Sequence, residues 1–232
     1  MPLVLRTRRA DLREYMDDPA CSLKRLRATY ARFGTVNRIF SGWWTLYRRY
    51  LRPQLSANRT NRLLDVGFGG GDIPRALLSW AERDGLRLDI YAIDPDPRAA
   101  AFAHALPSRR GLSFEQTDTR TVRARGDTFD VVISNHLLHH LSDAEVQGLC
   151  CDSSALGRVV LHNDIARADV AYAGFAALTG PFFRGSYITP DGLTSVRRSY
   201  TPEELREVVS TGWRVTRPYP YRLLLSHGLT NA

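Results

Sequence analysis

The sequence predicts an α/β fold in which a mostly parallel sheet carries helices on both faces. Three observations predict it. Beyond residue 60, short apolar runs alternate with segments of helical periodicity. The run FDVVISN, residues 129–135, is almost wholly apolar, as a strand buried on both faces should be. Four glycines fall within residues 67–71, directly after the first apolar run, where a sheet of this kind binds its ligand.

Residues 1–60 predict a helical cap or lid in front of the sheet. Leu23, Leu26, Tyr30 and Phe33 recur at spacings of three and four, which places them on one helical face. This aromatic face is expected to be either core or the wall of a pocket that closes over the sheet. We assign Tyr30 to substrate binding on the second interpretation.

Residues 61–232 predict the main domain. The pattern predicts strands, in order, at residues 62–66, 88–94, 112–118, 129–135 and 157–164. Helices are predicted at residues 73–80 and 97–106, and after capping boxes that begin at Ser142 and Thr201. Two final runs, 213–220 and 221–228, are too close for a crossover helix, so an antiparallel hairpin is expected at the sheet edge. The insertion 166–199 is expected to be a substrate lid.

The net charge of +8 is concentrated at the start of the chain. Residues 1–60 hold 13 basic and four acidic side chains, whereas the remainder is nearly balanced. Such a segment suits nucleic acid, an acidic carrier protein or an anionic substrate, or is a solvated helical face. The sequence has no apolar run near the roughly 20 residues that span a bilayer, no signal-peptide pattern and no disulfide pattern. A cytoplasmic protein without membrane contact is expected.

The glycine loop, residues 67–71, lets the backbone pass close under a ligand. A dinucleotide site requires a third glycine where Asp72 stands, and the carboxylates of Asp65 and Asp72 would repel a pyrophosphate. S-adenosylmethionine (SAM) has no phosphate and carries sulfonium and ammonium cations, which nearby carboxylates favour. Asp94, at the end of the second strand, is placed to accept hydrogen bonds from a ribose diol. The acidic loop therefore favours SAM.

Further polar residues follow the other strands. Asp118, with Thr119, is expected at the adenine amino group, and Asn135 near the methionine end. Arg38 is expected to reach the cofactor carboxylate. The full set of expected cofactor residues is Asp65, Gly67, Phe68, Gly69, Gly71, Asp94, Pro95, Asp118, Thr119, Asn135 and Arg38.

These landmarks resemble the class I SAM-dependent methyltransferases. The matching motifs are D-x-G-x-G-x-G at residues 65–71, Ile-Asp at 93–94, the lone Asp118 and FDVVISNHLLHHL at 129–141. The resemblance spans roughly residues 60–225. It implies a Rossmann-like, seven-stranded, mostly parallel sheet with an antiparallel C-terminal hairpin, and SAM as the cofactor.

The N-terminal segment carries a narrower resemblance. The stretch YARFGTVNRIFSGWWTLYRRYLRP, residues 30–53, is similar to the lead-in of the ubiquinone/menaquinone methyltransferase group. Val36-Asn37 replaces the Met-Asn of that group, and two adjacent tryptophans are bulkier than its pattern. The quinone precursor of that group is not carried over to this chain.

Histidines supply the candidate base for methyl transfer. A phenol must lose its proton, and histidine is the usual acceptor. His136, His139 and His140 follow the fourth strand, near the expected methyl group, and we favour His139 as the base. The alternative role for such a histidine is to brace the loop by hydrogen bonds. Arg197 and Tyr200 are expected to contact the substrate.

No metal is expected on the pattern of the catechol-type O-methyltransferases. That pattern has an Asp after strand four and an Asp-Asn pair after strand five. Here Asn135 ends strand four and the pair is Asn163-Asp164, so one carboxylate is lost and the order is reversed. Magnesium usually takes carboxylate ligands.

The predicted function is methylation of a small aromatic or polyketide-like acceptor, at a hydroxyl, in secondary metabolism. One alternative is C-methylation of an aromatic ring of the quinone-precursor type. The other is RNA methylation that uses the basic first 60 residues. Enzymes that methylate exocyclic base amines usually carry a Pro-Pro-aromatic motif after strand four, and Ser-Asn-His-Leu stands there, at residues 134–137. Nucleic acid is therefore disfavoured, an acidic carrier stays open, and a monomer or homodimer is expected.

Overall fold

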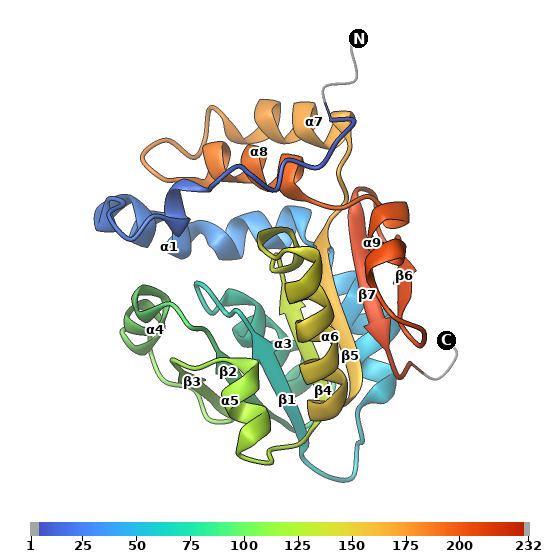
Figure 1. Cartoon of the computed structure of the whole chain (residues 1–232). Coiled ribbons are helices and arrows are strands. Elements are labelled where there is room, and N and C mark those ends of the chain that lie inside the picture. The colour runs from blue at the N-terminus through green and yellow to red at the C-terminus, as the bar shows by residue number, and fades with distance from the viewer. Residues whose placement is uncertain (1–4, 230–232) are drawn as a thin grey trace.

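The computed structural model describes residues 5–229. Its strands are β1 (Asn61–Val66), β2 (Leu88–Ile93), β3 (Leu112–Glu115), β4 (Phe129–Asn135), β5 (Gly157–Ile165), β6 (Arg214–Thr216) and β7 (Arg222–His227). They form one sheet in the order β3-β2-β1-β4-β5-β7-β6 (Figure 1). β1 to β5 are parallel, and β7 is antiparallel to both β5 and β6. The predicted fold class and its C-terminal hairpin are confirmed.

Apolar layers cover both faces of the sheet because successive side chains of a strand point in opposite directions. The flanking helices are α3 (Asp72–Arg83), α4 (Pro97–His104), α5 (Thr119–Ala124), α6 (Asp143–Leu156) and α9 (Pro202–Val208). Leu64 of β1 packs with residues of α5, α6 and α9 on one face. Its neighbour Leu63 packs with α3 on the other face.

The second half of the predicted N-terminal cap belongs to that second layer. It consists of α2 (Trp43–Leu46), a π-helical turn η2 (Tyr47–Leu51) and a 3-10 turn η3 (Arg52–Gln54). Trp43, Tyr47 and Leu51 are almost fully buried, in the cluster that includes Leu63 and α3. Residues 43–51 therefore contribute the side chains of Trp43, Leu46, Tyr47 and Leu51 to the main domain's core.

A separate upper layer lies across the carboxyl ends of the parallel strands (Figure 1). Its helices are α1 (Leu23–Phe40), α7 (Asp169–Thr179) and α8 (Ile188–Arg198), preceded by a short turn η1 (Tyr15–Asp17). α7 and α8 occupy the insertion that the sequence predicts as a lid, and their mutual packing is close. A Cβ on Gly192 of α8 would lie 2.3 Å from the ring of Phe175 on α7. Only glycine fits at that crossing.

Local signals account for most element ends. Both predicted capping boxes are present, at Ser142 with Glu145 and at Thr201 with Glu204. One detail differs from prediction. The third strand, predicted to reach residue 118, ends at Glu115 because α5 follows almost at once. Across residues 5–229 the structure has no helix that is both long and apolar enough to cross a membrane.

Candidate active site

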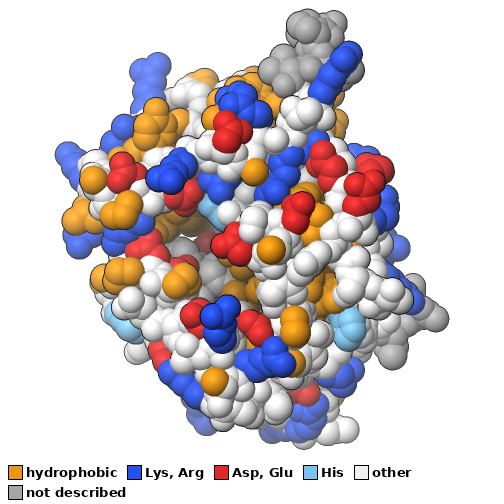
Figure 2. Space-filling model, in the orientation of Figure 1, with side chains coloured by type: hydrophobic (Ala, Val, Ile, Leu, Met, Phe, Trp, Pro, Cys, Tyr) orange, Lys and Arg blue, Asp and Glu red, His pale blue; other side chains and the backbone are white. Residues whose placement is uncertain are grey.

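A cavity of about 1110 Å³ lies between the upper layer and the carboxyl ends of β1, β2 and β4. Figure 2 shows a hollow beneath the upper layer on this face of the molecule. The sheet side contributes residues of the glycine loop and of the segment after β4. Helices α1, α7 and α8 contribute from above. The cavity thus lies at the sheet edge where the sequence predicts a ligand.

The glycine loop adopts a conformation that side chains disfavour. Gly67, Gly69 and Gly71 all have positive φ, between 53° and 77°. A Cβ on Gly71 would also lie 2.9 Å from the ring of Phe114. The N–H of Gly69 donates to Asp94 Oδ2 at 2.9 Å, which ties the loop to the end of β2. The glycines therefore add no side chains to the floor of the cavity, and the hydrogen bond to Asp94 fixes the position of the loop.

Three carboxylates, those of Asp65, Asp72 and Asp94, meet at this floor without an ion pair to residues 5–229. Asp65 is buried, and its Oδ2 accepts no hydrogen bond from residues 5–229. Burial, and then the charges of Asp72 and Asp94, hold the pKa of Asp65 well above its ordinary value. Burial raises the pKa of Asp72 to about 6, although Asn37 donates to it at 3.0 Å, and raises that of Asp94. Such a group of acids favours a bound cation.

Most of the expected cofactor residues line this one cavity. They are Asp65, Gly67, Phe68, Gly69, Asp94, Pro95 and Asn135. Gly71 ends the glycine loop and does not itself line the cavity, and three others lie away from it. Asp118 caps α5 by accepting from the N–H of Thr121 at 2.8 Å, Thr119 donates to Asp152, and Arg38 is exposed on α1. The structure therefore does not bring Asp118, Thr119 and Arg38 to the cavity.

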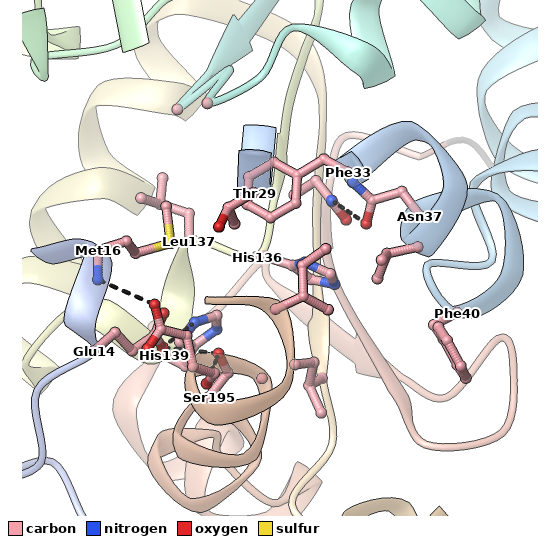
Figure 3. Close-up of a pocket in the computed structure, with 18 of the residues that line it drawn as sticks. Glu14, Met16, Thr29, Phe33, Asn37, Phe40, His136, Leu137, His139 and Ser195 are labelled. Atoms are coloured by element: carbon pink, nitrogen blue, oxygen red, sulfur yellow. Dashed lines mark hydrogen bonds and ion pairs between the residues drawn. The ribbon is translucent and has the colours of Figure 1, made fainter. Parts of the chain in front are cut away.

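His139 lies buried in the cavity wall beside Glu14, as Figure 3 shows, and its other side meets Asp164. Its Nδ1 lies 2.7 Å from Asp164 Oδ1, and its Nε2 lies 3.3 Å from Glu14 Oε1. Burial lowers the pKa of His139, but the charges and hydrogen bonds of Asp164 and Glu14 outweigh burial and raise the pKa to about 9. Asp164 and Glu14 therefore stabilise the charged form of the ring.

His136 has a different environment. Its backbone is left-handed, with φ of 56°, and its Nε2 lies 2.8 Å from a guanidinium nitrogen of the buried Arg222. Burial, and then the charge of Arg222, hold the pKa of His136 well below its ordinary value. His136 is thus a neutral ring that accepts a hydrogen bond, and Arg222 is a fixed cation in the cavity wall.

His140 completes a cluster with residues that precede α1. Its Nδ1 lies 3.4 Å from Asp17 Oδ2, and its Nε2 lies 3.8 Å from Glu14 Oε2. Burial raises the pKa of Asp17, but His140 and Arg198 outweigh it and lower the pKa to about 2. The side chain of Arg198 also donates to the carbonyl of His139 at 3.2 Å, which braces the histidine turn η4 (Leu138–His140).

Of the expected substrate residues, one lines the cavity and two lie outside it. Tyr30 lines the cavity from α1. Tyr200 is buried outside it and donates to Asp143 Oδ1 at 2.8 Å. Arg197 also lies outside, and its carbonyl accepts from the N–H of Arg9. The outer cavity wall is instead apolar, and the residues that form it include Phe33, Ile39, Phe40, Val170, Phe175 and Leu178.

Sequence reasoning misses several polar residues of this wall. Glu14 and Asp17 come from the irregular segment before α1, Asp191 from α8, and Arg222 from the last strand. None stands at the end of a parallel strand, and none belongs to a periodic pattern. Arg222 is the one that the sequence could have indicated as a site residue, because it is a charged residue beside the apolar run of YRLLLSHG.

Solved structures share this architecture. The plantazolicin methyltransferase BpumL, in complex with a triazolic desmethylPZN analog and SAH, matches with a TM-score of 0.54. The match covers 88% of this chain and 95% of that one, at 15% identity. Magnesium protoporphyrin IX methyltransferase from Synechocystis PCC 6803 matches with a TM-score of 0.50 and 15% identity, over 84% and 80% of the two chains. At such identities the likeness establishes the fold.

A family described as "Methyltransferase domain" matches residues 64–150, which hold the glycine loop, Asp94 and the histidine turn. This match supports the predicted resemblance to the class I SAM-dependent methyltransferases. The predicted family resemblance is thereby confirmed.

Curated relatives of this chain lie at a distance. The ubiquinone biosynthesis O-methyltransferase of Methylobacterium sp. (strain 4-46) is 27% identical over 165 residues, which are 70% of this chain and 62% of the relative. The protein of the same name from Methylocella silvestris is 27% identical over 152 residues, 64% of this chain and 56% of the relative. The chain thus spans about three-fifths of the length of these relatives.

Proposed function

We propose that this protein transfers the methyl group of SAM to a hydroxyl of a small aromatic acceptor that carries an apolar substituent. One observation carries the proposal. A single cavity joins the acidic floor of Asp65, Asp72 and Asp94 to a wall of histidines and apolar side chains. Donor and acceptor can therefore meet without water between them.

The charges of the floor support the donor half of the proposal. SAM brings a sulfonium and an ammonium to a place where Asp65, Asp72 and Asp94 form no ion pair with residues 5–229. Asp94 already accepts hydrogen bonds from the N–H groups of Gly69 and Asp96. Each of its oxygens retains a lone pair for a ribose hydroxyl. Pyrophosphate would meet only repulsion here.

The apolar wall supports the acceptor half. Phe33, Phe40 and Phe175 offer aromatic faces to a flat ring. Ile39, Val170 and Leu178 also line the cavity, yet they are 56%, 63% and 57% exposed. Apolar residues therefore continue from the cavity to its mouth, as an acceptor with an alkyl or polyketide-like substituent requires. The relatives named as ubiquinone biosynthesis O-methyltransferases agree with an aromatic acceptor.

The histidine wall supports transfer to oxygen. A phenol must lose its proton as the methyl group arrives, whereas the displacement itself needs mainly alignment. Glu14, His139 and His140 are proton-binding side chains that line the cavity, and both rings contact the carboxylate of Glu14. We assign this cluster to the acceptor hydroxyl, with Asp164 holding His139 in place. Methylation at a ring carbon stays the alternative.

RNA is a weaker alternative because the N-terminal arginines are engaged within the protein. Arg8 donates to the carbonyls of Leu141 and Arg198, at 2.6 and 2.7 Å. Arg59 is paired with Asp130 at 2.5 Å. These contacts hold the N-terminal segment against the main domain, so the basic excess of residues 1–60 has a structural use.

The test is label transfer from trideuteromethyl SAM to matched acceptors. Phenols with short and long alkyl chains are compared with their methyl ethers, which lack the free hydroxyl. We expect labelled ethers from the phenols, faster turnover with the longer chain, and no label on the ethers. Label on a ring carbon would favour the C-methylation alternative, and label on RNA but on no phenol would contradict the proposal.

A further inference from the structure

Two histidine rings face one carboxylate at the acceptor side of the cavity. Glu14, His139 and His140 each offer one ligand atom, and these atoms lie within 4.8 Å of one another. The carboxylate comes from the segment before α1, and both rings come from the turn η4. Residues more than 120 positions apart therefore converge on one point.

The distances suit a shared metal ion. His139 Nε2 lies 3.3 Å from Glu14 Oε1, and His140 Nε2 lies 3.8 Å from Glu14 Oε2. Two ligands of a tetrahedral zinc ion, each about 2.0–2.1 Å from it, lie roughly 3.3 Å apart. The three side chains need only small shifts to close on an ion.

The outer contacts orient both rings as a metal site requires. The Nδ1 of His139 is held by Asp164 at 2.7 Å, and the Nδ1 of His140 faces Asp17 at 3.4 Å. Metal-bound histidines almost always make such a contact through their other ring nitrogen. Ser195 Oγ donates to Glu14 Oε1 at 2.7 Å and fixes the carboxylate. Each of the three ligand residues thus has its own support.

Charge and ligand type indicate which ion. Glu14 is 4% exposed and has no Lys or Arg partner among the ion pairs of residues 5–229. Because a buried charge is costly unless it is compensated, a bound cation would stabilise this carboxylate. Imidazole with carboxylate suits zinc and related transition metals, whereas magnesium prefers oxygen ligands. We propose that Glu14, His139 and His140 bind a divalent transition-metal ion of the zinc type.

The site has an open side. All three ligand residues line the cavity, so a further coordination position faces the acceptor space. A Lewis acid lowers the pKa of a bound hydroxyl. If the proposed function holds, the ion would bind the acceptor oxygen there and favour its deprotonation. This site is distinct from the catechol-type pattern, whose positions after strands four and five differ.

Calorimetric titration of chelator-treated protein with Zn²⁺, without SAM or acceptor, tests the site. We expect one equivalent to bind with micromolar or tighter affinity, and Mg²⁺ to show no saturable binding. Glu14→Gln and His140→Gln should each weaken zinc affinity by about 100-fold, and Asp17→Asn by about 10-fold. His104→Gln, at an exposed histidine outside the cavity, should change nothing.

Two results would overturn the proposal. One is the absence of zinc binding tighter than millimolar, and the other is equal zinc affinity in wild type, Glu14→Gln and His140→Gln. Thermal unfolding and SAM titration of each variant show whether it is folded, and His140 is partly exposed, so His140→Gln disturbs the core least. Zinc binding without methyl transfer would refute the proposed function alone, and methyl transfer without zinc binding would refute the metal site alone.

Discussion

Asp94 shows how one side chain connects the glycine loop to the cavity. It ends β2, accepts the N–H of Gly69 and still faces the ligand space. Sequence reasoning reaches Asp94 and Asp65 because the end of a parallel strand fixes a position along the sheet edge. It does not reach Glu14 or Arg222, because only tertiary packing brings their segments to the cavity. It also assigns Asp118 to the site, whereas its oxygen satisfies the first turn of α5.

Asp94→Ala tests the ribose position. Loss of the carboxylate should weaken SAM binding by about 1–3 kcal/mol, or roughly 5- to 150-fold in Kd. Calorimetric titration measures the change. Asp118→Asn is the matched control, since it alters an aspartate outside the cavity and keeps a capping side chain. Equal affinity in Asp94→Ala and wild type would remove the ribose from this position.

Asp72 should make SAM binding depend on pH. Its pKa is raised to about 6 by burial, so it is ionised above that pH and protonated below. SAM affinity should therefore fall as the pH is lowered from 7 to 5, because a neutral acid no longer attracts the cations. Asp72→Asn should bind more weakly at pH 7 and show a flatter pH profile. A wild-type affinity that is constant over this range would contradict the assignment.

The raised pKa of Asp72 has the opposite effect on the stability of the ligand-free protein, which falls as the pH rises. The folded protein retains a proton on Asp72 that the unfolded chain releases near pH 3.8. Stability of the free protein is therefore lost as the pH rises from about 4 through about 6. Asp72→Asn should stabilise the free protein at pH 7, by on the order of 1–3 kcal/mol in urea unfolding.

At the scale of elements, the sequence predicts the individual strands and helices from patterns within each one. It does not predict how those elements pack against one another. The buried strands, the two capping boxes and the hairpin follow from periodicity and turn chemistry. The packing of residues 43–51 on the sheet does not, because an aromatic helical face looks the same whether it covers a sheet or a pocket. The short helix α5 is not predicted, because its six residues show no apolar periodicity.

The glycine loop makes a sharp prediction at this scale. Gly71→Ala places a Cβ 2.9 Å from the ring of Phe114 and forces a residue with φ of 70°. It should lower the free energy of unfolding by about 1–3 kcal/mol and weaken SAM binding. Gly85→Ala is the control, since its φ is 71° but no atom lies within 4 Å of the added Cβ. Equal losses in the two variants would show that the contact with Phe114 has no energetic effect.

The crossing of α7 and α8 should govern the acceptor and spare the cofactor. Gly192→Ala brings a Cβ to 2.3 Å from the ring of Phe175, which must move within the cavity wall. The KM for a phenolic acceptor should rise several-fold, while the Kd for SAM stays within about twofold. Gly148→Ala on α6 meets no atom within 4 Å and serves as the control. Weaker SAM binding in Gly192→Ala would mean that the two halves of the cavity are not separable.

On the scale of the whole molecule, the cavity exists because two layers meet. The sheet presents its carboxyl ends, and the upper layer is held above them by contacts from distant parts of the chain. Asp191 on α8 accepts the backbone N–H groups of Tyr15 and Met16 at 2.8 and 3.0 Å, which positions the segment that carries Glu14. Part of the basic N-terminus, read from sequence as a possible nucleic-acid contact, also makes internal contacts, as Arg8 and Arg59 show.

Calorimetric titration with SAM and with NADH tests the central claim most directly, after mass spectrometry has checked the purified protein for retained ligand. The acidic floor predicts micromolar binding of SAM and no binding of NADH, because a pyrophosphate would face Asp65 and Asp72. Binding of NADH, or of neither compound, would contradict the claim that three buried carboxylates in this cavity are there to receive the cationic groups of SAM.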